Sequence, residues 1–425
     1  MRTLILVDRL HFCFQYVRGI SCGRMLRSYS INDCQIMEFN YSALETVVVG
    51  KSVNTELPKL AKKLSTERIF LFASNSLSKT TGGFAELREA LGNSYVGSFD
   101  QIGSHTPRSD VLAALLEVRK SNADLMVSLG GGSIIDACKA VQLALDQNVN
   151  SEEELLQYAQ QSDGTQGPRW GDFGLLSDHS RVRQIAVPTT LSGAEYSNNA
   201  GVLNTQSSAK EGYRGKDLCP QCIVYDPHLA ASTPEWLWLS TAIRSLDHAV
   251  EGFCSKETSP YLDAHFLHAI SMFAESLPQV KTDPDNLQAR SLNFQAVWLA
   301  CCGLGTVSHG ASHGIGYILG SLCGVPHGHT SCVMLPAVLK WNGEEFSARQ
   351  KSISTALGKP ELVASEAVKE LVSGLQLPTS LRDVGVEQTQ LDKIAEKAIL
   401  HPVVRHNPRS LTSAEQVREI LELAW

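Results

Sequence analysis

The sequence predicts an α/β dinucleotide-binding domain, with a parallel sheet and helices on both faces, followed by an all-helical domain. Three observations support this. Short apolar runs alternate with helical patterns from about residue 44, one such run leads directly into three glycines, and strand signals stop after residue 227. Alternating strands and helices favour a parallel, doubly wound sheet. We expect the ligand site in the cleft between the two domains.

The length of 425 residues exceeds what one compact core usually holds. We expect an N-terminal extension over residues 1–36, a nucleotide-binding domain over 37–231 and a helical catalytic domain over 232–425. The extension carries five arginines against two aspartates. This is a weak organelle transit signal, and a plain extension or a wrongly chosen start codon explains it equally well. We therefore expect a cytoplasmic protein, with mitochondria as the alternative.

The composition excludes several classes of protein. The net charge is −7, and no run of basic residues stands out, so nucleic acid is not an expected partner. No apolar run reaches the roughly 18 residues that span a bilayer. The 11 cysteines are irregularly spaced, which favours reduced thiols, and Cys219 and Cys222 form a lone C-x-x-C. A homodimer is compatible with the sequence, which does not fix the oligomeric state.

The first half gives the strand and helix signals in order. Strands are expected at 46–50, 68–73, 124–129 and 184–187, and helices at 57–64, 111–118 and 134–145. The segment 160–182 is rich in polar residues and glycine and is expected to form a surface loop.

Two junctions at strand ends are candidate cofactor sites. The strand at 124–129 leads into Gly130–Ser133 and a helix, so Gly131, Gly132 and Ser133 could bring free amides to a pyrophosphate. This is not the G-x-G-x-x-G fingerprint, and a plain turn is the alternative. After the strand at 184–187, the side chains of Thr189, Thr190 and Ser192 follow, where ligands bind in open α/β sheets.

The second half is helical. Thr233 is expected to cap a helix that begins with Pro234. Further helices are expected at 262–276, 287–302, 361–375 and 388–399, and a capping box at 412–415 opens the last helix.

A histidine-rich block organises this half. His309, His313, His327 and His329 lie within about twenty residues, among glycines and other small residues, which suits close approach to a ligand. A helix around Arg244 and His248 is expected to face this block.

Taken together, residues 40–425 resemble the iron-dependent alcohol dehydrogenase superfamily. The resemblance rests on five ordered motifs: Gly130–Ser133 with Asp136, Pro188–Thr190, Tyr225–Pro227, His248–Glu251, and the histidine block ending at Pro326-His327. The segment Thr190–Glu195 and the C-terminal tail are most like the maleylacetate reductase branch, and there is also a likeness to fungal secondary-metabolism dehydrogenases. The resemblance implies a dehydroquinate synthase-like architecture and an NAD(P)-dependent dehydrogenase or reductase acting on alcohol and carbonyl groups.

The resemblance also implies a set of site residues. In metal-dependent members one aspartate and three histidines bind iron or zinc, and the histidines match His248, His313 and His327. The aspartate lies four residues before the first histidine, where this sequence has Arg244. A further family histidine is replaced by Tyr317, and the pattern assigns no role to His309. Asp247 lies about 100° round the helix from His248 and cannot simply substitute.

This departure favours a site without metal. Three imidazoles could still bind an ion, but a guanidinium is always charged and repels a dication. Maleylacetate reductases also lack the aspartate and are thought to work without metal, so Arg244 could bind a substrate carboxylate or polarise the carbonyl.

The remaining roles follow from the same resemblance. Tyr317 and His313 are the candidate proton donors, with His248 and His327 beside them. Gly131, Gly132, Ser133 and Asp136 are expected to bind the cofactor. Asn75 stands where NAD-selective members often carry an aspartate, so both NAD and NADP remain candidates. The alternatives are a metal-dependent alcohol dehydrogenase proper and a nucleotide-binding homologue that has lost catalysis.

Overall fold

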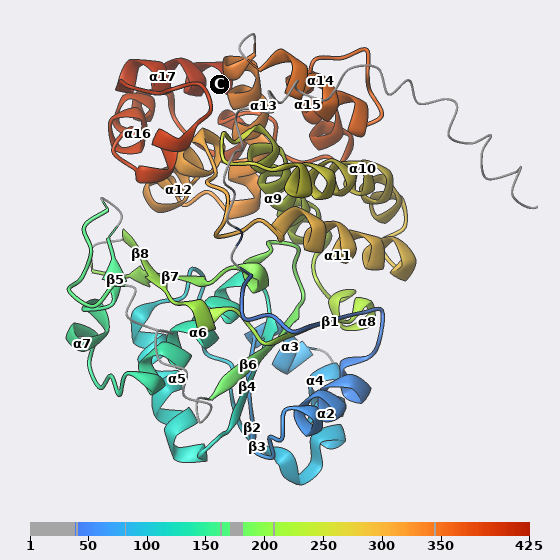
Figure 1. Ribbon diagram of the computed structural model, residues 1–425, viewed down its shortest axis with the longest axis vertical. Coiled ribbons are helices and arrows are strands. Elements are labelled where there is room, and N and C mark those ends of the chain that lie inside the picture. Colours follow the sequence, from blue (N-terminus) through green and yellow to red (C-terminus); the bar gives the residue numbers. More distant parts are fainter. Residues whose placement is uncertain are drawn as a thin grey trace, which may run out of the picture. The chain divides into compact units, whose positions relative to one another are not determined.

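Six parallel strands form the central sheet of the computed structural model, which describes Phe39 and residues 41–80, 82–161, 164–170, 182–206, 209–343 and 346–425. The expected extension at 1–36 lies outside these residues. Tyr41–Trp425 form one compact unit (Figure 1). The sheet order is β1-β9-β6-β4-β2-β3, and every neighbouring pair is parallel. The strands are β1 (Thr46–Val49), β2 (Ile69–Ala73), β3 (Tyr95–Phe99), β4 (Leu125–Gly130), β6 (Arg183–Pro188) and β9 (Cys222–Tyr225).

Helices cover both faces of this sheet, as expected. In β2 the side chains alternate: Ile69 and Leu71 belong to the core beneath α2 (Val53–Lys63) and α4 (Gly82–Leu91). Phe70 and Phe72 belong to the core beneath α5 (Arg108–Ser121) and α6 (Gly132–Asp146). Near-continuous apolar strands such as β2 and β4 are typical of a parallel sheet that is buried on both faces.

The sequence did not predict a second, antiparallel sheet. It consists of β5 (Ala159–Gln160), β8 (Ala209–Arg214) and β7 (Asn199–Asn204), in that order. β8 gives no apolar strand signal because its sequence is Ala-Lys-Glu-Gly-Tyr-Arg. Its lysine and glutamate are used inside the fold, as described below. Residues 171–181 of the expected surface loop lie outside the described part.

The second half consists of helices, which confirms the predicted fold class. They are α9 (Glu235–Cys254), α10 (Pro260–Thr282), α11 (Leu287–Cys301), α12 (Ala311–Cys323), α13 (His327–Asn342), α14 (Ser347–Ala356), α15 (Ala364–Gly374), α16 (Leu391–Ala398) and α17 (Ala414–Leu423). Short helices α3 (Asn75–Thr80), α7 (Glu152–Leu156) and α8 (Pro227–Ala230) complete the chain with several 3-10 turns. None of the described helices is long and apolar enough to cross a membrane.

Two helix starts differ from the prediction. Thr233 does not cap α9, because its hydroxyl donates to the carbonyl oxygen of Thr189 at 2.6 Å. The last helix is capped by Ser413, one residue later than the expected capping box begins. No side chain caps α9, whose N-cap is Pro234, whereas the Ser413 hydroxyl accepts from the amide of Gln416 at the start of α17.

The carboxyl ends of the strands bring the candidate cofactor residues together. The amide of Ser74 donates to Leu129, and the amide of Thr189 donates to Gly130. The loops after β2, β4 and β6 therefore lie along one edge of the sheet. Helix α9 is attached to the same edge, because Thr241 and Ser245 hydrogen-bond the backbone of Leu191.

Candidate active site

Two glycines form a close-packed turn at the start of α6. A Cβ on Gly131 would lie 3.0 Å from Thr190 Cγ2, and a Cβ on Gly132 would lie 3.1 Å from Ser192 Oγ. The first amides of a helix have no partner inside the helix and carry partial positive charge. The loops after β4 and β6 thus meet, and a side chain at Gly131 or Gly132 would crowd Thr190 or Ser192.

Ser133 and Asp136 have contacts within the protein. Ser133 Oγ accepts from the amide of His105 at 3.2 Å, and its carbonyl accepts from the Thr106 hydroxyl at 2.9 Å. Asp136 Oδ2 accepts from the amide of Gly201 at 3.1 Å, which ties α6 to β7. Ser133 keeps its hydroxyl proton for a ligand, whereas Asp136 holds the hairpin.

Asn75 is exposed at the start of α3, beside the glycine turn. Its amide nitrogen lies 3.5 Å from the carbonyl oxygen of Asp100. The Asp100 carboxylate accepts from Ser78 at 2.7 Å, and this hydrogen bond, helped by Lys79, lowers the Asp100 pKa. This corner therefore offers an amide, a carboxylate and an ammonium near each other.

Helices α9, α12 and α13 carry the expected catalytic residues. Arg244 and His248 are four residues apart on α9 and share one face, as do His313 and Tyr317 on α12. His327 is the first residue of α13. His309 precedes α12, on the chain that turns into it.

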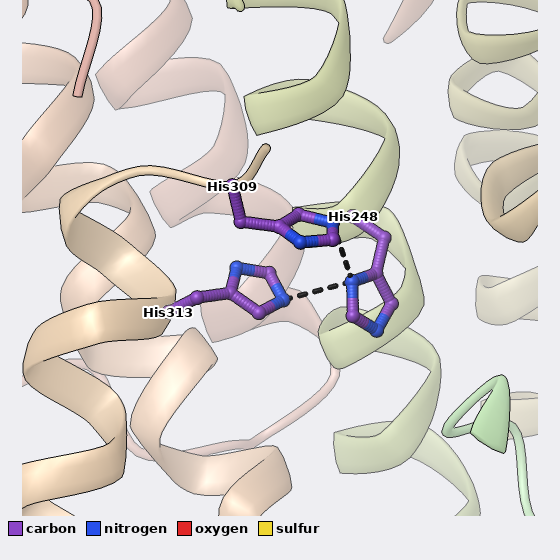
Figure 2. A group of neighbouring side chains, drawn as sticks. All are labelled: His248, His309 and His313. Atoms are coloured by element: carbon purple, nitrogen blue, oxygen red, sulfur yellow. Dashed lines mark hydrogen bonds between the residues drawn. The ribbon is translucent and has the colours of Figure 1, made fainter. Parts of the chain in front are cut away.

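Three histidines form one hydrogen-bonded group (Figure 2). His248 Nδ1 lies 2.8 Å from His313 Nε2 and 3.0 Å from His309 Nε2. The rings of His309 and His313 stack with centroids 4.2 Å apart. The sequence pattern gave His309 no role, yet it joins this group, and its spacing of four from His313 was the available signal.

Carboxylates support this group from the side of His313. Glu251 Oε2 lies 2.7 Å from His313 Nδ1, and the Glu251 carboxyl accepts from the amides of Gly310 and Ser312 at 2.9 and 2.8 Å. Asp247 Oδ2 lies 3.5 Å from the same His313 nitrogen. Asp247 and Glu251 therefore face Nδ1 of His313, whereas His248 faces its Nε2.

Burial and nearby positive charge keep the histidines neutral. Burial, with the charge of Arg244, lowers the pKa of His309 to about 3 and that of His313 well below its usual range. Burial and neighbouring cations lower the pKa of His248 and of His327 in the same direction. Burial also raises the pKa of the Asp247 and Glu251 carboxyls. The site is therefore built to hold few charges besides that of Arg244.

The Arg244 guanidinium is buried, with 6% of its surface exposed. Its Nη1 donates to Ser331 Oγ at 3.1 Å, and the guanidinium lies 5.4 Å from the ring centre of Tyr317. Among the described residues no carboxylate forms an ion pair with Arg244. Most of its five donors remain for another group.

Tyr317 occupies the centre of this region. Its ring is half-buried and lies 6.5 Å from His313, 6.2 Å from His327 and 5.3 Å from His401, measured between centroids. His313 is fully buried, and both of its ring nitrogens are hydrogen-bonded. Tyr317 is therefore the more accessible of the two expected proton donors.

His327 stands apart from the other histidines. Its Nε2 lies 3.4 Å from Lys210 Nζ, and its Nδ1 is buried with no hydrogen-bond partner among the described residues. His105 packs against it with ring centroids 5.4 Å apart. Lys210 and His105 were missed from the sequence, where neither belongs to the recognised motifs.

These distances do not match a single divalent ion held by His248, His313 and His327. Among the described residues, His327 belongs to neither group of side chains whose ligand atoms lie within 4.8 Å of one another. Metal-bound histidines nearly always donate their other ring N–H to a partner, as His313 could but His327 does not. Two compact groups of described residues could hold an ion, one of His248, His309 and His313 and one of Asp247, Glu251 and His313.

Comparison with known proteins shows the family to which the chain belongs. Residues 45–227 match the iron-containing alcohol dehydrogenase model, and residues 238–425 match the C-terminal model of the same family. Dehydrogenase FUM7 of Gibberella moniliformis is 32% identical over 400 residues, covering 86% of this chain and 92% of that protein. Maleylacetate reductase 1 of Rhodococcus opacus is 27% identical over 379 residues, covering 89% and 94%.

Solved structures show the same fold. The sulfoacetaldehyde reductase from Bifidobacterium kashiwanohense, in complex with NAD+, superimposes with a TM-score of 0.79 at 22% identity, covering 91% of this chain and 98% of that one. The maleylacetate reductase from Rhizobium sp. strain MTP-10005 superimposes with a TM-score of 0.77 at 23% identity, covering 92% and 98%. The chain therefore belongs to the iron-containing alcohol dehydrogenase family and is an NAD(P)-dependent oxidoreductase of alcohol and carbonyl groups.

Proposed function

We propose that this enzyme reduces a carbonyl compound, or oxidises the matching alcohol, without a catalytic metal ion. The observation that carries the proposal is Arg244, a buried guanidinium where metal-dependent members have an aspartate ligand. A guanidinium is permanently charged, and it repels a dication placed a few ångströms away. The position of His327 outside the compact histidine group, together with its unpartnered Nδ1, supports the same conclusion.

The cofactor site is proposed along the edge formed by the loops after β2, β4 and β6. Gly131, Gly132 and Ser133 would bind the pyrophosphate, with Thr189, Thr190 and Ser192 beside them. The contacts of Gly131 and Gly132 fit this role, because a Cβ at either position would be crowded. When bound, the nicotinamide ring supplies or accepts the hydride.

His248 connects this loop to the histidine group. A hydrogen bond with the Ser192 backbone opposes the fall in the His248 pKa. The neutral ring of His248 can therefore orient His313 and His309 without adding charge beside Arg244. We assign His248, His313 and His327 to positioning the substrate end of the site rather than to metal binding.

Arg244 is proposed to bind an acidic group of the substrate. Its planar donors match a carboxylate, and a bidentate pair would compensate a buried charge that has only a hydroxyl partner at present. Maleylacetate reductases among the relatives are named for an acidic substrate. Tyr317 is proposed to give its hydroxyl proton to the oxygen of the new alcohol, since it is half-buried and close to Arg244.

The experiment that tests this function follows NADH and NADPH oxidation with maleylacetate and with small uncharged aldehydes. We expect turnover of the acidic substrate, and a fall in kcat/KM of about 100-fold in Arg244→Met, since one partner of a buried charge pair is lost. Arg244→Lys should retain part of the activity. If Arg244→Met leaves kcat/KM unchanged with maleylacetate, the assigned role is wrong. Cofactor binding without turnover on the whole panel would favour a degenerate homologue.

The enzyme is proposed to discriminate only weakly between NADH and NADPH. Asn75 lacks the carboxylate that would reject a 2′-phosphate, and Lys79 is nearby, but Asp100 offsets part of that positive charge. We expect both NADH and NADPH to support turnover. Asn75→Asp should shift the ratio of kcat/KM values toward NADH by roughly tenfold. A ratio that does not change in this variant would place the ribose elsewhere.

A further inference from the structure

A lysine from the α/β half reaches the histidine site in the helical half. Lys210 lies on β8, and its side chain crosses Gly201 of the neighbouring strand β7. A Cβ at Gly201 would overlap Lys210 Cε and lie 2.9 Å from Nζ. Glycine at 201 therefore gives the lysine its path, and Nζ ends 3.4 Å from His327 Nε2.

The hairpin that carries this lysine is firmly held. Glu211, the next residue, is fully buried and pairs with Arg108 at 3.1 Å. Tyr213 donates to the other oxygen of Glu211 at 3.0 Å. On the opposite strand, the Gly201 amide donates to Asp136. A rigid support of this kind suits a side chain that must keep one position in an active site.

Two cations therefore converge on one site, and neither has an anionic partner. Among the described residues, no carboxylate lies within 4.0 Å of the charged nitrogens of Lys210 or Arg244. The charge of Asp136 acts on Lys210, and the charge of Arg244 acts on Asp247. Both carboxylates are hydrogen-bonded to other groups: Asp136 accepts from the Gly201 amide, and Asp247 accepts from two serine hydroxyls. Partly buried charges without a partner are costly, so a site that keeps two of them fits a ligand with more than one oxygen acceptor.

The position of Lys210 matters for the chemistry. The ammonium of Lys210 is directed at His327 Nε2, one of the two ring nitrogens through which this histidine could hold an ion. A fixed ammonium at this place can do the electrostatic work of an ion, since it favours negative charge on a nearby oxygen.

We propose that Lys210 is a catalytic residue that binds the substrate carbonyl oxygen while Arg244 binds a carboxylate of the same molecule. This inference rests on the proposed metal-independent function, and it narrows the substrate class to oxo acids. The hydride of the reduced nicotinamide goes to the carbonyl carbon of a saturated oxo acid, or to the far alkene carbon of a conjugated one such as maleylacetate. In both cases the C=O bond pair moves onto oxygen beside the Lys210 ammonium. That oxygen then takes a proton from Tyr317, which solvent restores, and the nicotinamide is left oxidised.

The first test measures turnover. Lys210→Met should lower kcat with maleylacetate by about 100-fold, as loss of one oxyanion donor does, while the NADH dissociation constant stays within about twofold. Lys210→Arg should keep more activity than Lys210→Met because it keeps the charge. The exposed Lys256→Met is the matched control and should behave as wild type. Circular dichroism and thermal unfolding check that each variant is folded. A kcat within threefold of wild type in folded Lys210→Met overturns the proposal.

The second test needs no turnover. Zn²⁺ binding is measured by calorimetry on wild type, Arg244→Asp and the double variant Arg244→Asp/Lys210→Met. We expect the double variant to bind Zn²⁺ at least tenfold more tightly than Arg244→Asp, because the ammonium no longer faces His327. Replacing His327 by alanine in the double variant should remove that gain. Equal affinity in the single and double variants overturns the placement of Lys210 but leaves the metal-independent function intact. Stoichiometric zinc in the wild type would contradict the proposed function itself.

Discussion

Gly193 lies in the loop after β6, which contacts α9 through the backbone of Leu191. The variant Gly193→Ala tests how strongly the stability of the fold depends on the conformation of this loop. The backbone of Gly193 is left-handed, with φ 75° and ψ 11°. An alanine there costs about 1–2 kcal/mol from its conformation alone. Its Cβ would overlap Cys301 Sγ and lie 3.3 Å from Cys301 Cβ. Cys301 is 1% exposed on α11, so it has little room to move.

Overpacking of this kind costs about 1–3 kcal/mol, so Gly193→Ala should lower the free energy of unfolding by roughly 2–5 kcal/mol in all. Urea denaturation followed by tryptophan fluorescence measures this, and NADH binding should weaken in parallel because Ser192 is the adjacent residue. Adding Cys301→Ala removes the overlap but not the backbone strain, so the double variant should recover about 1–3 kcal/mol. A single variant within about 0.5 kcal/mol of wild type would refute this reasoning.

Three further changes test other parts of the account. Burial raises the Glu195 pKa from 4.5 to about 7, so between these pH values the folded protein keeps a proton that the unfolded chain loses. The free energy of unfolding should therefore fall by up to about 3 kcal/mol as pH rises from 4.5 to 7. In urea titrations, Glu195→Gln should flatten this dependence on pH. Asp226 accepts from the amide of Val53 and caps α8, so Asp226→Ala should cost roughly 2–4 kcal/mol by the same assay, and Asp226→Asn less. Tyr317→Phe should lower kcat by about 100-fold without changing NADH affinity, as stopped-flow or steady-state kinetics can establish.

Much of the fold could be predicted because its signals are local. The buried runs of β2 and β4 and the glycine turn after β4 are contiguous in sequence, so periodicity and turn chemistry were enough. β7 and β8 were missed for a physical reason. Their residues serve contacts made across the fold, such as Glu211 with Arg108 and Lys210 with His327, rather than an apolar face.

The site was predictable to a similar degree. Arg244, His248, His313 and Tyr317 were assigned from the motif positions of the family resemblance, and the structure places them near one another. The grouping of His309 with His248, and the separation of His327 from both, depend on how α9, α12 and α13 pack. No sequence period reports that packing. Lys210 could not have been chosen over the other lysines, since only the path over Gly201 directs it to the site.

The metal content of the active protein tests the central claim most directly. Protein purified without chelators should contain far less than one iron or zinc ion per chain, and its kcat with maleylacetate should not change after EDTA treatment. Stoichiometric metal, with activity lost in EDTA and restored by adding that metal, would contradict metal-independent hydride transfer at Arg244.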